Sequence, residues 1–154
     1  MAETSAGILL YRKTDDLEFF LAHPGGPYWK NKDEGAWSIP KGLIDETEES
    51  IDAAVREFEE EVGFRPEGDF IGLGSIRQKG GKEVHAWAVE GDLPDDFTLE
   101  SNTFEMEWPP NSGETQRFPE IDQAQFFPVD VALDKINPAQ AEFIYRIRKK
   151  LKED

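Results

Sequence analysis

The segment from Glu49 to Val62 constrains the fold most narrowly, because its apolar residues recur with the period of a helix. Successive residues turn by about 100° around a helix, so four apolar side chains share one narrow stripe. They are Ile51, Val55, Phe58 and Val62. Gly63 follows, and glycine tolerates the positive φ at which helices commonly end. The sequence therefore predicts a helix over residues 49–62 that ends at Gly63 and packs its apolar stripe on a sheet.

Four glutamates crowd the end of this predicted helix, within the stretch REFEEE that begins at Arg56. Glu57, Glu60 and Glu61 have the spacing i, i+3, i+4 and share the face beside the apolar stripe, whereas Glu59 points away. Like charges at this spacing destabilise a helix by about 0.2–0.5 kcal/mol per pair. The face is either solvated surface or a site for a hard divalent cation such as Mg²⁺ or Mn²⁺, which prefers oxygen ligands. Helical spacing alone leaves both interpretations open.

The acidic composition limits the partners of the chain. Against 17 lysines and arginines stand 33 aspartates and glutamates, which gives a net charge of -16. Such a surface repels long nucleic acids and anionic membranes, so we expect neither as a partner. The chain has no cysteine, which excludes disulfides and thiolate metal ligands and agrees with a cytoplasmic location. Its first residues have neither the charge pattern of a secretory signal nor the length of a membrane span.

The remaining sequence reads as alternating strands and turns. Apolar patterns and turn residues predict a hairpin of residues 4–13 and 17–23, a short strand over 37–40, a second hairpin of 70–78 and 83–90, and a strand over 125–129. Residues 91–120 read as a long acidic loop with one strand at 102–108, and helices are expected over 131–135 and 138–152. We therefore expect one α/β domain over residues 1–154, with a mixed sheet covered by helices on both faces.

The residues that precede the helix decide between the two interpretations of its acidic face. From Gly42 the chain reads GLIDETEESIDAAVREFEEEVGF, which resembles the Nudix box, the signature motif of the Nudix hydrolase family. A chance match to its nine defined positions is very improbable. The matching residues are Gly42, Glu48, Arg56, Glu57, Phe58, Glu60, Glu61, Gly63 and Phe64. The resemblance implies a Nudix α/β/α sandwich, and a tight backbone is the expected reason for Gly42.

The resemblance also implies an activity and roles for the residues of the box. Nudix enzymes hydrolyse a phosphoanhydride in a nucleoside diphosphate linked to another group, with Mg²⁺ or Mn²⁺ as cofactor. Glu57, Glu60 and Glu61 are then expected to bind the metal. Glu48 is expected to pair with Arg56, which would also neutralise part of the acidic cluster.

A further carboxylate, as metal ligand or general base, is expected from a loop after the box. The candidates are Glu100, Glu105, Glu107, Glu114 and Glu120. We favour Glu120 for both roles, because it precedes the aromatic pair Phe126-Phe127 in a run that resembles the family's entry into its last strand. An ordinary surface glutamate is the alternative.

Basic and aromatic residues outside the helix are candidates for substrate binding. Lys41 adjoins the first glycine of the box, and three more lie on the second predicted hairpin: Lys79, Lys82 and His85. The resemblance to dinucleoside polyphosphate hydrolases implies that such residues hold a chain of phosphates. Tyr28 and Trp29 occur in a predicted loop and could stack on a base. For each residue, an ordinary solvent-exposed or structural side chain is the alternative.

Together these features favour a Nudix-type pyrophosphohydrolase that acts on a small nucleotide, as a monomer or a homodimer. The preferred substrate is a dinucleoside polyphosphate such as diadenosine tetraphosphate. One alternative is a nucleoside triphosphate pyrophosphatase that clears damaged or non-standard nucleotides. Another is a nucleotide-binding Nudix domain without catalysis, which the intact box disfavours.

Overall fold

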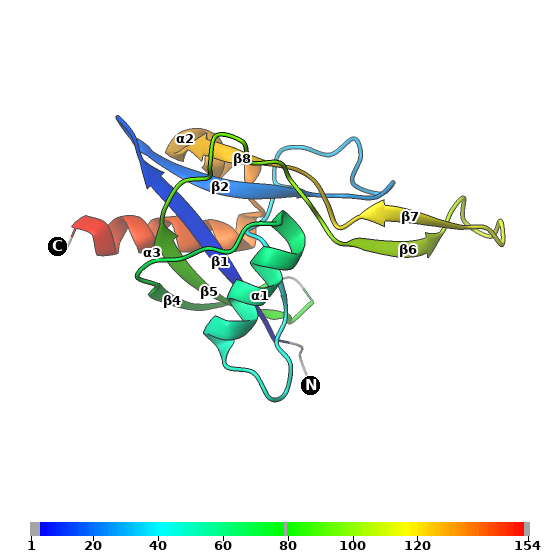
Figure 1. The fold of residues 1–154 in the computed structure, drawn as a ribbon, viewed down its shortest axis with the longest axis horizontal. Helices are drawn as coiled ribbons and strands as arrows, with labels where there is room; N and C mark the ends of the chain where they lie inside the picture. The colour runs from blue at the N-terminus through cyan, green and yellow to red at the C-terminus, as the bar shows by residue number, and fades with distance from the viewer. Residues whose placement is uncertain (1–3, 79, 153–154) are drawn as a thin grey trace.

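The computed structural model describes residues 4–78 and 80–152 (Figure 1). No helix among these residues is both long and apolar enough to cross a membrane. In chain order the elements are β1 (Thr4–Lys13), β2 (Leu17–Pro24), β3 (Lys41–Leu43), α1 (Ser50–Val62), β4 (Ile71–Arg77), β5 (Glu83–Glu90), β6 (Thr103–Glu107), β7 (Thr115–Pro119), β8 (Ile121–Pro128), α2 (Val129–Lys135), the 3-10 turn η1 (Pro138–Gln140) and α3 (Ala141–Lys152).

Strand β1 lies at the centre of a six-stranded mixed sheet. The order of the main path is β4-β5-β1-β2-β8, and β3 also pairs with β1. Strands β1 and β5 run parallel, whereas the other pairs are antiparallel. Because β5 occupies one edge of β1, β2 and β3 share the other edge: residues 5–7 pair with β3 and residues 11–13 with β2. Between these two stretches, the backbone N–H of Ile8 donates to the Pro40 carbonyl oxygen at 3.2 Å.

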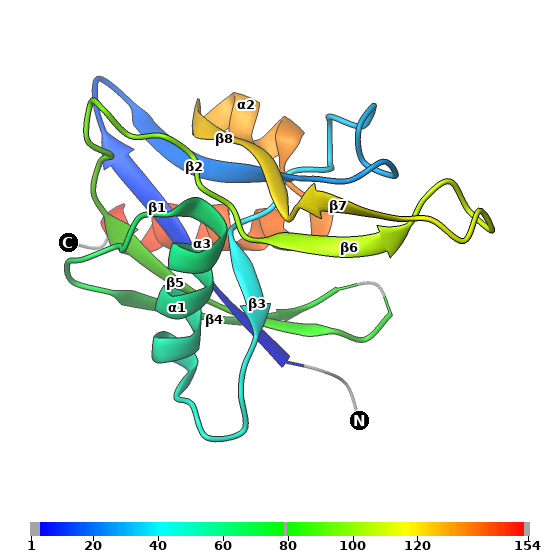
Figure 2. The ribbon, with the colours of Figure 1, turned by 45° about the vertical axis from the view of Figure 1, so that its right-hand side comes forward.

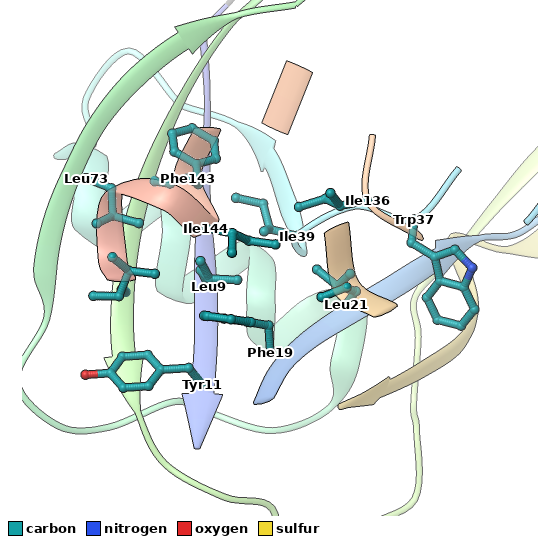
Figure 3. Packing of buried hydrophobic residues seen from close by; sticks show 14 of the residues in the cluster. Leu9, Tyr11, Phe19, Leu21, Trp37, Ile39, Leu73, Ile136, Phe143 and Ile144 are labelled. Carbon is teal, nitrogen blue, oxygen red and sulfur yellow. The ribbon is translucent and has the colours of Figure 1, made fainter. Parts of the chain in front are cut away.

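Helices cover both faces of this sheet. Successive residues of a strand point to opposite faces, so alternate residues of β1 are buried in two different cores. Ile8 and Leu10 pack in a core with Phe58 of α1. Leu9 packs on the other face in a core with Ile144 of α3, which Figure 3 shows from close by. In Figure 2, α1 lies in front of the sheet and α3 behind it. This arrangement confirms the α/β/α sandwich expected from the sequence.

Two short strands differ from the sequence prediction. The strand predicted over residues 37–40 is wrong: Ser38 makes an isolated bridge to Ala22, and Trp37 makes one to Ile136. The paired strand is β3, at residues 41–43, directly after the predicted one. Ser38 pairs with β2 and Trp37 pairs with the residue that follows α2, so the two do not form one strand. The apolar pattern of this segment reflects burial rather than the hydrogen-bond ladder of a strand. Strand β8 also begins at Ile121, four residues before the predicted start.

The long segment between β5 and β8 contains a hairpin of which the sequence analysis predicts only the first strand. Strand β6 pairs with β7 from Thr103↔Pro119 to Glu107↔Thr115. The hairpin extends away from the six-stranded sheet (Figures 1 and 2). Phe104 and Met106 are half-buried, and the residues that alternate with them are exposed. The hairpin therefore presents one apolar face, which lies beside the loop after β2.

Candidate active site

Helix α1 is anchored to the sheet by the stripe that the sequence predicts. Phe58 and Val62 have no exposed surface. Gly63 ends the helix at a φ of 84°, and its backbone N–H donates to the Glu59 carbonyl oxygen. The Glu59 carboxylate lies apart from the other glutamates, 3.7 Å from Arg65. These positions leave Glu57, Glu60 and Glu61 as the acidic face beside the buried stripe.

Arg56 organises the acidic residues around the start and the end of this helix. Its Nε and Nη2 atoms each donate to a carboxylate oxygen of Glu48 at 2.8 Å. Its Nη1 donates to Glu57 at 2.8 Å and to Glu60 at 3.3 Å. These bonds confirm the expected Glu48–Arg56 pair, and the hydrogen bonds from Arg56 lower the pKa of Glu48 to about 2. A two-pronged guanidinium contact of this kind fixes the orientation of a carboxylate as well as its charge.

Gly42 makes room for the carboxylate of Glu57. A Cβ atom at Gly42 would lie 2.0 Å from both Cδ and Oε2 of Glu57, far inside van der Waals contact. The backbone of Gly42 has no positive φ. The role of this glycine is therefore the close approach of a charged side chain, and not the tight backbone expected from the sequence.

Glu61 is the most perturbed acid of the cluster. One of its oxygens accepts a hydrogen bond from the backbone N–H of Lys41 at 3.1 Å. Burial raises the pKa of Glu61 to about 8, and the charges of Glu57 and Glu120 contribute in the same direction. Burial also lowers the pKa of the Lys41 side chain. Because burial and neighbouring carboxylates disfavour the charged form of Glu61, a bound cation would stabilise its carboxylate.

A cleft of about 340 Å³ opens beside Glu61, between the end of β2 and the segment that leads into β3. Lys41 and Glu61 line one part of it, and Trp29 and Glu120 line another. Glu120 lies between β7 and β8, so the hairpin delivers a carboxylate to the cleft. The other lining residues are Ala22, Pro24, Ala36, Ser38, Ile39, Gln78, Ile121, Asn137 and Gln140.

The donor set fits a hard divalent cation, although it is not gathered around one point. Within residues 4–78 and 80–152, no three or more His, Cys, Asp or Glu side chains stand close enough together to hold a metal ion. Arg56 holds Glu57 and Glu60 by hydrogen bonds, and the Lys41 amide holds Glu61. A cation would compete with these bonds for carboxylate oxygens, the ligands that Mg²⁺ and Mn²⁺ prefer. The chemistry of the residues therefore fits the metal.

Three other predicted substrate-binding residues, Tyr28, Lys82 and His85, do not line the cleft. Lys82 is exposed, and its charge contributes to lowering the pKa of Lys41. His85 contacts Glu83 on its own strand at 2.9 Å and does not line the cleft. Tyr28 lies in a neighbouring pocket rather than in the cleft itself. Lys79 lies outside the described residues.

The aromatic pair and the other acidic candidates lie outside the cleft. Phe127 packs on Trp37 in the core, and Phe126 packs on Phe20 beneath Arg12. None of the remaining candidate carboxylates lines the cleft: Glu100, Glu105, Glu107 and Glu114. Of the five glutamates considered, the structure brings Glu120 to the acidic cluster.

A buried glutamine at the cleft is missed by the sequence analysis. Gln140 is 1% exposed, and its Nε2 donates to Ser38 Oγ at 3.1 Å and to Gln78 Oε1 at 2.9 Å. Its Oε1 accepts from the backbone N–H of Ile39 at 3.0 Å. This network fixes the segment that leads into β3 and Lys41. A lone glutamine in a helical turn carries no signal of such a role in the sequence.

Comparisons with known proteins agree with this geometry. The sequence model of the family described as "NUDIX domain" matches residues 1–147. Comparison with curated proteins finds no match. Solved structures that share the fold include a C. elegans Ap4A hydrolase in a binary complex, which is 20% identical with a TM-score of 0.70 over 97% of this chain and 99% of that one.

Two further solved structures broaden the comparison. The NUDIX domain of Shewanella oneidensis NrtR, complexed with ADP ribose, is 15% identical with a TM-score of 0.66 over 98% of this chain and 89% of that one. A MutT protein from Methanosarcina mazei Go1 is 19% identical with a TM-score of 0.63 over 98% and 96%. At these identities the likeness shows the fold. The family match over residues 1–147, together with the Arg56-centred carboxylates, shows that the chain belongs to the NUDIX family and is a pyrophosphohydrolase of that type.

Proposed function

We propose that this protein hydrolyses a phosphoanhydride bond of a dinucleoside polyphosphate such as diadenosine tetraphosphate, with Mg²⁺ or Mn²⁺ as cofactor. The observation that carries the proposal is the acidic cluster that Arg56 organises at a cleft containing Lys41. A protein with a net charge of -16 needs cations to accept a polyphosphate. We also propose a cytoplasmic location, in agreement with the absence of cysteine.

The residues of the acidic cluster and of the adjoining cleft divide the work of such a reaction. Glu57, Glu60, Glu61 and Glu120 would hold the cation, which neutralises phosphate charge and lowers the pKa of bound water when present. Arg56 limits the repulsion among these carboxylates and orients them. Lys41 supplies a positive charge beside the phosphate path. Glu120 is also our candidate for the general base, because it lines the cleft and is not one of the carboxylates that Arg56 contacts.

The preference for a dinucleotide depends on the phosphate-binding residues. The segment SIPKG, residues 38–42, contains Lys41, which lines the cleft. Lys82 lies near enough to lower the pKa of Lys41. Two positive charges suit a chain of several phosphates better than a single anhydride. The likeness to the C. elegans Ap4A hydrolase points the same way. The alternative is a nucleoside triphosphate pyrophosphatase.

Product analysis separates these functions. With Mg²⁺ and diadenosine tetraphosphate we expect an asymmetric split into ATP and AMP, and slower turnover of single nucleoside triphosphates. Faster release of pyrophosphate from nucleoside triphosphates would favour the alternative. Nucleotide binding without turnover of either substrate would favour a binding domain. The NUDIX domain of NrtR, which was solved with bound ADP ribose, is the reason to include this outcome.

A further inference from the structure

A second pocket adjoins the acidic cleft. It has a volume of about 430 Å³ and lies between the loop after β2 and the apolar face of the β6–β7 hairpin. Its walls are residues 24–29, Phe104, Met106 and Glu120. The pocket and the cleft share Pro24, Trp29 and Glu120 in their walls, so the two lie side by side. A ligand with phosphates in the cleft can therefore extend into this pocket.

Two glycines hold the loop against the hairpin and shape the pocket. The backbone N–H of Gly25 donates to the Glu120 carbonyl oxygen at 2.9 Å, and a Cβ at Gly25 would lie 2.0 Å from the carbonyl oxygen of Pro119. Gly26 has a φ of 97°, and a Cβ there would lie 2.9 Å from Cζ of Phe104. Any side chain at these positions would force the loop and the hairpin apart. The pocket is thus a built feature of the contact between the two segments.

Aromatic rings dominate the pocket, and contacts outside it orient them. Tyr28 is 59% exposed and meets the ring of Trp108 edge-on at 5.4 Å. Trp29 is 41% exposed, and Nζ of Lys32 lies 5.1 Å from the centre of its ring. Both rings line the same pocket, and contiguous exposed apolar surface of this kind marks a ligand or partner site.

The polar groups of the pocket are few. Among its lining side chains, the Tyr28 hydroxyl, the Trp29 indole N–H and the Glu120 carboxylate are the hydrogen-bonding groups. Recognition in such a pocket rests on stacking and apolar contact, and hydrogen-bond readout of a base edge contributes little. Stacking tolerates any base, because each has a π face.

We propose that this pocket binds a nucleobase of the substrate and accepts adenine and guanine with little discrimination. The proposal rests on the proposed function, because that function places the phosphates in the adjoining cleft. A nucleobase is the planar, largely apolar part of a nucleotide, and ribose supplies the short link from the shared wall at Trp29 and Glu120. A volume of about 430 Å³ falls within the range of pockets that enclose small ligands.

The test compares a nucleotide with the same sugar phosphate lacking its base. Calorimetry with Mg²⁺ measures the binding of AMP, GMP and ribose 5-phosphate to wild type and to Phe104→Leu and Trp29→Leu, which remove a ring but keep an apolar side chain. Steady-state kinetics with diadenosine tetraphosphate supply KM and kcat. The controls are Arg117→Gln, on the exposed outer side of the hairpin, and Tyr145→Leu, which removes a 52% exposed ring from α3.

We expect wild type to bind AMP roughly tenfold or more tightly than ribose 5-phosphate, and GMP within about threefold of AMP. Each ring variant should lose most of this preference and raise KM about tenfold, with kcat changed less than about threefold. The two controls should match wild type. Circular dichroism and thermal unfolding verify that each variant folds. If one ring variant does not fold, the other still tests the proposal.

The outcomes separate this proposal from the proposed function. Turnover with an unchanged KM and an unchanged AMP preference in both ring variants overturns the pocket assignment and leaves the function standing. Equal binding of AMP and ribose 5-phosphate by wild type also overturns it. Binding of AMP that depends on Phe104 and Trp29, without hydrolysis of any nucleotide, supports the pocket and refutes the proposed function. A much weaker binding of GMP than of AMP overturns the claim of low discrimination.

Discussion

Substitution of Gly42 by alanine should separate activity from stability. The added methyl would lie 2.0 Å from Cδ and Oε2 and 2.5 Å from Oε1 of Glu57. These atoms belong to the end of a flexible side chain, so the backbone need not move. Glu57 must rotate away, and the bond from Nη1 of Arg56 to its Oε1, now 2.8 Å, is lost.

The expected magnitudes follow from what this rotation breaks. A hydrogen bond to a charged group contributes about 1.5–3 kcal/mol. The 15% exposed Glu57 side chain can regain water when it rotates, so we expect the net destabilisation to lie near the lower end, about 1–2 kcal/mol. That corresponds to a fall in Tm of roughly 2–8 °C for a chain of this size. A carboxylate displaced by more than about 1 Å should reduce kcat/KM by about 100-fold.

The assay measures kcat/KM for diadenosine tetraphosphate, Mn²⁺ affinity and Tm in Gly42→Ala and in Gly91→Ala. The control methyl at Gly91 meets Leu10 at 3.4 Å, an ordinary contact, and should change none of the three. A double variant with Glu57→Gln should be no less active than Glu57→Gln alone, because both changes act through one carboxylate. Retention of kcat/KM and Mn²⁺ affinity by Gly42→Ala, within about threefold of wild type, would refute the requirement for Glu57 at this position.

Three further predictions concern the core and the titrating groups. Phe58→Ala should lower the free energy of unfolding by about 3–5 kcal/mol in urea titrations, because Phe58 is fully buried; a change below about 1 kcal/mol would contradict its anchoring role. Burial raises the pKa of Glu61 to about 8, so metal-free Glu61 favours the protonated form and metal must displace a proton. Mn²⁺ affinity should therefore rise from about pH 6 to about pH 8 in wild type and stay flat in Glu61→Gln, measured by calorimetry; equal slopes would refute the assignment. The pKa of Glu48 is lowered to about 2 from an ordinary 4.5, so its pairing with Arg56 stabilises the fold above that ordinary value and is lost as pH falls toward 2. The difference in Tm between wild type and Glu48→Gln should accordingly shrink on acidification, and a difference independent of pH would contradict the pairing.

The elements that bury apolar side chains could be predicted from the sequence. The stripe on α1 and the long run in β1 have strong patterns, since both faces of β1 are covered and nearly all of its residues are buried. Strand β7 has the sequence TQRFP and is mostly exposed. It is held by backbone pairing to β6 rather than by an apolar face, so neither pattern nor composition marks it. The segment with Pro109, Pro110 and Gly113 has the composition of a loop, so the sequence does not indicate that it connects the two strands of a hairpin.

The candidate site was predictable where it depends on helical spacing and not where it depends on contacts between segments. Spacing places Glu57, Glu60 and Glu61 on one face of α1, and the motif pairs Glu48 with Arg56. The approach of Glu57 to Gly42 and the network of Gln140 join residues that are distant along the chain. The loop after β2 likewise approaches the hairpin where Gly25 meets Pro119 of β7, the strand that no sequence pattern marks.

The central claim is that the carboxylates organised by Arg56 hold a divalent cation that brings a phosphoanhydride to attacking water. Mn²⁺ titration followed by electron paramagnetic resonance tests it most directly, on wild type and on Glu57→Gln, Glu60→Gln and Glu61→Gln, with turnover measured in the same samples. We predict saturable binding by wild type, weakened roughly tenfold or more in each variant, with turnover lost in parallel. Wild type that binds no Mn²⁺, or full turnover in all three variants, would contradict the claim.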